Sequence, residues 1–203
     1  VHINAPFEEP LYETVSALSV AANTVAFANN TQIISIEEVS EYATIWNNAT
    51  KKMILVGVNE PNAISKKTIT AFAKEESVVV LTETTSNVHH ETFINTIDTI
   101  ITPFTEEDFE YFRPEILVTF GGMVVSKRIK TFLRKYKPKH HWHIDPWRAY
   151  DTFGALTKHF EVTPNVFFDA FLPLTNATES NYFQQFNAVK VLRKLKSDFY
   201  LSK

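Results

Sequence analysis

Cysteine is absent from this 203-residue chain, and its absence removes several kinds of chemistry at once. Disulfide frameworks, thiolate metal sites and cysteine nucleophiles are all excluded. Long apolar runs are also missing, since no window reaches the roughly 18 apolar residues that a membrane-spanning helix needs. The first residues do not have the pattern of a secretory signal peptide. These absences together predict a cytoplasmic protein with no integral membrane part.

Excess positive charge is a third feature that the chain lacks. Lysine and arginine number 20 against 23 aspartates and glutamates, so the formal net charge is -3. This balance gives no electrostatic reason to expect nucleic acid as a partner. With 44% hydrophobic residues, the length fits one large globular domain, or one domain with tails.

Glycine is scarce, because the whole chain has only four. The dinucleotide-binding pattern G-x-G-x-x-G and the Walker phosphate loop are both missing. The turn "GVNEPN" contains Gly57 alone, and "FGGMVVS" does not complete either pattern. Nicotinamide or flavin binding in the usual manner is therefore not expected.

Short apolar runs alternate with helical patterns along most of the chain. Continuous apolar runs are typical of strands buried on both faces, and their alternation with helices predicts a parallel sheet. We expect an α/β fold with an open, mostly parallel sheet and helices on both faces, a Rossmann-like arrangement of three layers. A short strand near Gln32–Ile34 and a helix beginning at Ser35 precede the alternation. The expected buried strands are 53–58, 77–83, 115–120, 140–145 and 159–164.

Two adjacent glycines, Gly121 and Gly122, end the third of these strands, and Ser126 opens a basic helix with Lys127 and Arg128. Ligands of such sheets bind at the carboxyl ends of the strands, and a helix N-terminus attracts anions. Cations at that terminus oppose the helix dipole by roughly 0.3–1 kcal/mol each, which suggests that an external anion arrives there. A tight turn with solvated charges is the simpler explanation of the same residues.

Histidines and polar loops offer further candidates. His141 and His143 alternate onto one face of "HHWHID", near His140 and Asp145, and two imidazoles on one face could bind zinc. No third and fourth ligand follows from the spacing, so packing against the core is the alternative that we favour. The loop "TETTSNVHHE" brings Glu83, Asn87, His89 and His90 to another strand end, where a plain connection is the more common role. No nucleophile set or carboxylate pair indicates a complete enzyme.

The opening residues "VHINAPFEEPLY" resemble the segment that leaves the first domain of thiamine-diphosphate enzymes. In particular, these residues are similar to the same segment in the 2-succinyl-5-enolpyruvyl-6-hydroxy-3-cyclohexene-1-carboxylate synthases of menaquinone biosynthesis. We refer to these enzymes as the menaquinone synthase family. "MILVGVNEPN", "ILVTFGGMVVSKRIKTFLRKY" and "HHWHIDP" follow in the order of the central domain of that family. The resemblance implies an isolated middle domain, with a linker from a preceding domain at 1–30, the central α/β domain at 31–176 and a helical segment or linker at 177–203.

What the resemblance implies about chemistry concerns mainly the complete enzyme. Synthases of this family decarboxylate 2-oxoglutarate and add the succinyl unit to isochorismate, with thiamine diphosphate and Mg²⁺ or Mn²⁺, as dimers or tetramers. The cofactor and metal are bound by flanking pyrimidine- and diphosphate-binding domains, so the 203 residues alone are expected to bind no cofactor and to be inactive. The glycine turn and the residues after it, Gly121, Gly122, Ser126, Lys127 and Arg128, are implied to help hold a carboxylate-bearing substrate. A stand-alone module that binds a small anion or nucleotide is the alternative.

Overall fold

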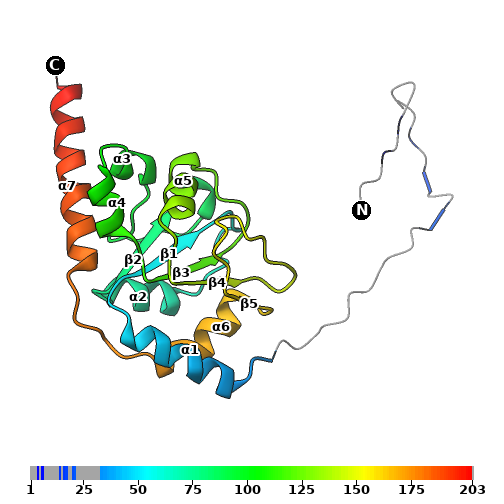
Figure 1. The fold of residues 1–203 in the computed structure, drawn as a ribbon. Helices are drawn as coiled ribbons and strands as arrows, with labels where there is room; N and C mark the ends of the chain where they lie inside the picture. Colours follow the sequence, from blue (N-terminus) through cyan, green and yellow to red (C-terminus); the bar gives the residue numbers. More distant parts are fainter. Residues whose placement is uncertain are drawn as a thin grey trace. The chain divides into compact units, whose positions relative to one another are not determined.

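The structure, a computed structural model, has a five-stranded parallel sheet at its centre (Figure 1). It describes residues 33–202 continuously and a few positions before them. The strands are β1 (Lys52–Val56), β2 (Val78–Thr82), β3 (Ile116–Phe120), β4 (His140–Ile144) and β5 (Lys158–Phe160). Their order across the sheet is β2-β1-β3-β4-β5, and every neighbouring pair is parallel. The expected α/β class is therefore confirmed.

The sheet is buried on both faces, as the unbroken apolar runs predict. Every residue of β1, β2 and β3 is buried. Alternate side chains point to opposite faces, so Ile54 and Val56 belong to one core cluster while Met53 and Leu55 belong to the other. Two separate hydrophobic cores, one on each face, hold the layers together.

Helices cover each face of the sheet and complete three layers (Figure 1). On the first face lie α1 (Ile36–Asn48), α2 (Lys66–Lys74) and α6 (Pro164–Phe171). On the second face lie α3 (Ile97–Ile101), α4 (Glu106–Phe112), α5 (Lys127–Lys135) and the first half of α7 (Tyr182–Leu201). Short 3-10 turns at Thr84–Ser86 and Leu172–Leu174 complete the described elements.

Serine caps fix where several helices begin. Ser35 precedes α1 and its hydroxyl accepts the Glu38 amide at 3.4 Å, as the capping spacing predicts. The expected strand near Gln32–Ile34 is wrong for Ile33 and Ile34, which have no regular structure, because the run leads straight into the helix cap. Gln32 lies outside the described residues.

The predicted domain boundaries stay predictions. Residues Gln32–Lys203 form one compact unit, in which the start of α7 packs on the second face. Most of the opening run "VHINAPFEEPLY" lies outside the described residues. Before residue 33, the positions that the structure describes are Asn4, Pro6, Thr14, Ser16, Ala17, Val20 and Ala21.

None of the described helices is both long enough and apolar enough to span a membrane.

Candidate functional site

The candidate site lies where the chain reverses its direction across the sheet. From β1 the chain moves to β2 on one side and then returns to β3 on the other side of β1. The crevice beyond the carboxyl ends of two such strands is where open parallel sheets bind ligands. The loops after β1 and β3 meet there, because the Gly57 amide donates to the Phe120 carbonyl at 2.9 Å and the Gly122 amide to the Val58 carbonyl at 2.7 Å.

Glycine is required at this crossing because the two loops contact each other through their backbones. A Cβ on Gly57 would lie 2.0 Å from the Gly122 carbonyl oxygen, which no real side chain tolerates. Gly121 has a φ of +81°, and a Cβ there would lie 2.5 Å from Asn59 Nδ2. The glycine pair therefore has a structural role in loop packing, whether or not a ligand also approaches it.

The N-terminus of α5 already holds an anion, and that anion is part of the chain. The Glu83 carboxylate accepts the Val125 amide at 2.7 Å and the Ser126 amide at 2.6 Å. The Ser126 hydroxyl accepts the Ile129 amide at 3.1 Å and donates to Asp98. A carboxylate from 43 positions earlier in the sequence thus already lies at the positive end of the α5 dipole, so the dipole alone does not require an external anion.

Cations on α5 differ in whether they have partners. Lys130 Nζ donates to the Val124 carbonyl at 3.1 Å, Arg134 Nε to the Thr152 carbonyl at 2.8 Å, and Lys135 pairs with Glu106 at 2.6 Å. The side chains of Lys127 and Arg128 are exposed, and neither forms a hydrogen bond or ion pair with another described residue. The side chains of these two cations are therefore available to an external anion.

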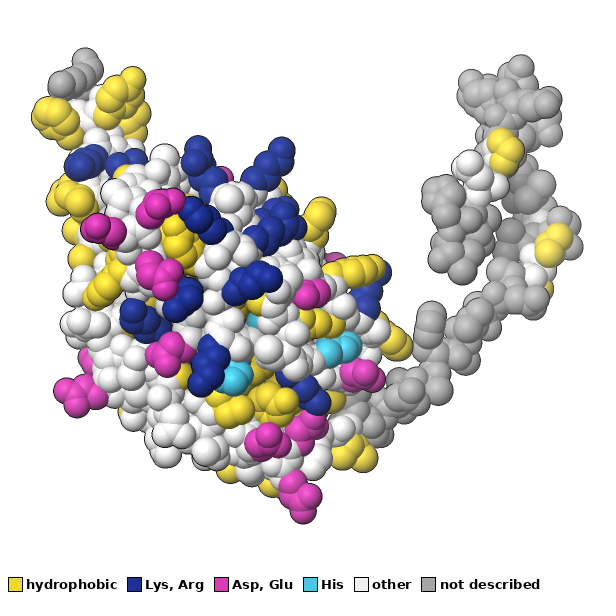
Figure 2. Space-filling model, in the orientation of Figure 1, with side chains coloured by type: hydrophobic (Ala, Val, Ile, Leu, Met, Phe, Trp, Pro, Cys, Tyr) yellow, Lys and Arg dark blue, Asp and Glu magenta, His cyan; other side chains and the backbone are white. Residues whose placement is uncertain are grey.

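A pocket of about 350 Å³ opens beside the glycine turn. Figure 2 shows lysine and arginine side chains gathered over this side of the molecule, around α5. Gly121 and Gly122 line the pocket, but Ser126, Lys127 and Arg128 do not. Its polar lining residues are Thr119, Lys130, Arg134, His141, His143, Asp145, Arg148, Tyr150 and Thr152.

Two histidines form the floor of this pocket through one shared hydroxyl. Thr119 Oγ1 lies 2.9 Å from His141 Nε2 and 2.8 Å from His143 Nδ1, which confirms that the two rings share a strand face. Burial lowers the pKa of His141 to about 4, and it also lowers the pKa of His143 against the opposing effect of Asp145. Both rings are therefore neutral near pH 7.

The histidine strand contacts both the core and the pocket, since His141 packs against Phe153 while His141 and His143 also line the pocket. His140 lies on the opposite side of the strand, near Trp142. Asp145 accepts the Trp147 and Arg148 amides at 2.8 and 2.9 Å, so its carboxylate organises the following loop. Among the residues that the structure describes, no three histidine, aspartate or glutamate side chains are placed to hold a metal ion.

The candidate residues in the loop after β2 have two different structural roles. Glu83 serves α5, while Asn87 donates to the Asn59 carbonyl at 2.7 Å and so ties this loop to the loop after β1. His90 lies 2.9 Å from the Thr92 hydroxyl, and His89 is exposed. The loop therefore connects elements, and only Glu83 of the four candidate residues reaches the N-terminus of α5.

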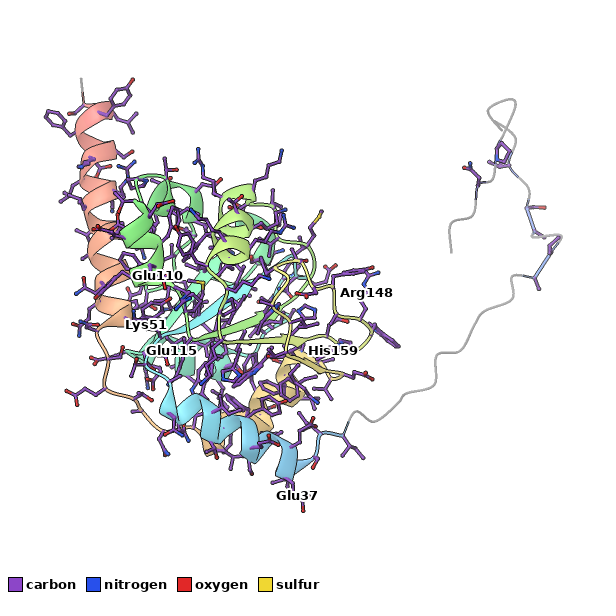
Figure 3. All side chains as sticks on the ribbon, in the orientation of Figure 1. Glu37, Lys51, Glu110, Glu115, Arg148 and His159 are labelled. Atoms are coloured by element: carbon purple, nitrogen blue, oxygen red, sulfur yellow. The ribbon has the colours of Figure 1, made fainter. Side chains whose placement is uncertain are left out.

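Three cations that line the pocket were not predicted as site residues from the sequence. Lys130 and Arg134 are four positions apart, which places them on one face of α5, and this spacing was a usable signal. Arg148 gave no such signal, because it lies on the long loop between β4 and β5. Figure 3 shows Arg148 on that loop, beyond His159 of β5.

Comparisons with known proteins agree with this fold. Residues 24–191 match the model of a protein family described as "Middle domain of thiamine pyrophosphate". A 2-succinyl-5-enolpyruvyl-6-hydroxy-3-cyclohexene-1-carboxylate synthase of Flavobacterium johnsoniae is 56% identical over 100% of the chain and 37% of its own length. A protein with the same description from Flavobacterium psychrophilum is 56% identical over 100% of the chain and 36% of its own length. Another, from Bacteroides thetaiotaomicron, is 30% identical over 90% of the chain and 33% of its own length. The chain thus spans about a third of the length of these relatives.

Proposed function

The chain belongs to the family of middle domains of thiamine pyrophosphate enzymes, and on that premise we propose that it is the middle domain of a synthase of the menaquinone synthase family. The identity of 56% over the whole chain to two such synthases carries this proposal. The reaction proposed for the complete protein is decarboxylation of 2-oxoglutarate and addition of the succinyl unit to isochorismate. The domain itself supplies structure and substrate-binding cations.

Lys127 and Arg128 are the proposed substrate-binding residues. They are exposed and unpaired among the described residues, while three other cations of α5 are engaged within the domain. Isochorismate carries two carboxylates, which suit a lysine and an arginine side by side. Because Glu83 already accepts the amides of Val125 and Ser126, the proposed substrate contacts begin at Lys127. Gly121 and Gly122 contribute by fixing the loop that leads into α5.

Cofactor and metal fall to other domains in this proposal. Thiamine diphosphate, with Mg²⁺ or Mn²⁺, would be held by the flanking pyrimidine- and diphosphate-binding domains of the same polypeptide. The described part of the chain offers no cluster of three metal-ligating side chains that would serve instead. We further propose a homodimer or homotetramer, a cytoplasmic location, and boundaries of the central domain near residues 31 and 176.

Replacing Lys127 by alanine in the complete protein tests the proposal. A hydrogen bond to a charged group contributes roughly 1.5–3 kcal/mol, so the KM for isochorismate is expected to rise about 10- to 100-fold. The KM for 2-oxoglutarate should change by less than about twofold. Lys135→Ala is the matched control, because Lys135 lies on the same helix but pairs with Glu106. An isochorismate KM that is the same in Lys127→Ala and in the control would contradict the role of Lys127.

A second candidate function, binding of a small anion, is favoured by the pocket beside the glycine turn. Lys130, Arg134 and Arg148 contribute three cations to its lining against the single carboxylate of Asp145. Titration calorimetry with a dicarboxylate and with a nucleotide would test it, using Arg148→Ala as the variant. Heat of binding that Arg148→Ala abolishes would support this function, and no heat with either ligand would remove it.

A further inference from the structure

Helix α7 has an inner face that belongs to the domain. Tyr182 and Phe186 are buried in the second core cluster. One turn further along, Lys190 Nζ donates to the carbonyls of Glu91 and Phe93 at 2.7 and 2.9 Å. These contacts fix which side of α7 faces the sheet, and Figure 1 shows the helix continuing past the body of the domain.

The same helix carries an apolar stripe on its opposite side, formed by Val191, Leu192 and Leu195. Nine residues make two and a half turns of an α-helix, so Val191 lies opposite Tyr182 and Leu195 lies opposite Phe186. The exposed fractions of Val191, Leu192 and Leu195 are 50%, 50% and 62%. The stripe is therefore a second face and not the continuation of the core-facing one.

Basic residues surround the stripe. Between positions 190 and 196 the sequence is "KVLRKLK", which contains four cations and no acidic residue. A surface that covers the stripe must also accommodate this charge, so its rim is expected to carry carboxylates.

The size of the stripe argues for an occupant on the same polypeptide. A stable interface between separate chains buries about 800 Å² on each partner, more than these three aliphatic side chains provide even with Phe199, which is 66% exposed one turn beyond Leu195. A tethered partner needs less, because the linker raises its effective concentration. The family match ends at residue 191, where the stripe begins, and the chain spans only 37% of the length of a relative that is 56% identical to it.

We propose that Val191, Leu192 and Leu195 dock the domain that follows in the longer polypeptide, on an apolar patch bordered by carboxylates. This inference rests on the proposed function, since it takes the chain as a middle domain with a further domain after it. Docking through α7 fixes the orientation of the middle domain relative to the next one. Lys127 and Arg128 lie on the same domain face as α7, so their approach to a shared active site depends on that orientation.

Thiol labelling of the longer polypeptide tests the docking, because residues 1–203 contain no cysteine of their own. Leu195→Cys probes the stripe, and Ser197→Cys is the control on an exposed position two residues away. The rate of alkylation by iodoacetamide at each site is measured by peptide mass spectrometry and divided by the rate in the urea-unfolded protein. The thiol introduced by Leu195→Cys is expected to react at least about tenfold more slowly than the thiol introduced by Ser197→Cys after this correction.

Two results would overturn the docking. One is equal corrected rates in the two variants, which would leave the stripe exposed in the complete protein. The other is slow labelling of the Leu195→Cys variant that becomes fast on dilution, which would assign the stripe to a second copy of the chain. The synthase activity of the unmodified longer polypeptide is measured separately, so loss of the proposed function is distinguishable from loss of the proposed contact.

Discussion

Glu83 is the residue whose replacement tests the architecture of the site most sharply. Its carboxylate accepts two backbone amides at the start of α5, at 2.7 and 2.6 Å, from Val125 and Ser126. Glu83→Gln removes the charge but keeps one oxygen that can accept one amide. A hydrogen bond to a charged group contributes roughly 1.5–3 kcal/mol, and Glu83 is only half buried. We therefore expect Glu83→Gln to lower the free energy of unfolding by about 1–2 kcal/mol.

Urea denaturation measures this loss directly. With a slope of roughly 2 kcal/mol per molar urea, the midpoint should fall by about 0.5–1 M. Hydrogen exchange at the Val125 and Ser126 amides should become faster in the same variant. Glu60→Gln is the matched control, because it removes an equal charge from an exposed side chain that bonds no other described residue. If Glu83→Gln and Glu60→Gln have the same midpoint as the native chain, the internal cap does not stabilise α5 and the reasoning fails.

Two further predictions concern the core and the crossing of the loops. Burial lowers the pKa of Lys52 to about 8, so above about pH 9 the native side chain is mostly neutral, while the unfolded side chain stays charged up to its usual pKa near 10.5. The unfolded state therefore binds more protons, and stability should rise by roughly 2 kcal/mol from about pH 8 to 9.5. Lys52→Met should abolish that rise in urea titrations. An unchanged rise in the variant would assign it to other groups. Gly57→Ala places a Cβ 2.0 Å from the Gly122 carbonyl oxygen and should lower stability by about 1–3 kcal/mol, whereas the nearest atom to a Cβ on Gly122 is Val58 Cβ at 3.3 Å. Thermal unfolding of Gly57→Ala and Gly122→Ala tests this, and equal melting temperatures would contradict it.

Local sequence patterns were sufficient to predict the layers of this fold. Strands β1 to β3 are five-residue, mainly apolar segments buried on both faces, and such segments leave few alternatives. The expected first strand extended two residues too far, to Val58. The structure ends it at Val56, because Gly57 and Val58 turn to contact the loop after β3. The predicted strand was wrong for Ile33 and Ile34 because this short β-type run lies directly before the Ser35 helix cap and forms no regular structure.

Long-range contacts explain what the sequence could not supply at the site. Glu83, whose carboxylate accepts two amides at the start of α5, lies 43 positions before Ser126, and no spacing rule joins the two. The same holds for the Thr119 hydroxyl between His141 and His143, which exists only because β3 and β4 are neighbours in register. The basic pair Lys127 and Arg128 was visible as a pattern, but the engagement of the other α5 cations was not.

The proposed middle-domain role explains why the domain has exposed cations and an exposed apolar stripe and yet no visible catalytic set. Lys127 and Arg128 lie at the carboxyl edge of the sheet, and α7, the helix that carries the stripe, packs beside β2. Each of these features is incomplete within residues 1–203. Each is accounted for if neighbouring domains supply the cofactor, the rest of the substrate site and the surface that covers α7.

The most direct test of the central claim is the reaction of the longer polypeptide that contains residues 1–203. The purified protein is supplied with 2-oxoglutarate, isochorismate, thiamine diphosphate and Mg²⁺, and both CO₂ release and isochorismate consumption are measured. The account predicts that the two occur in equal amounts and that both require thiamine diphosphate. A folded polypeptide that binds thiamine diphosphate but consumes no isochorismate would contradict the account.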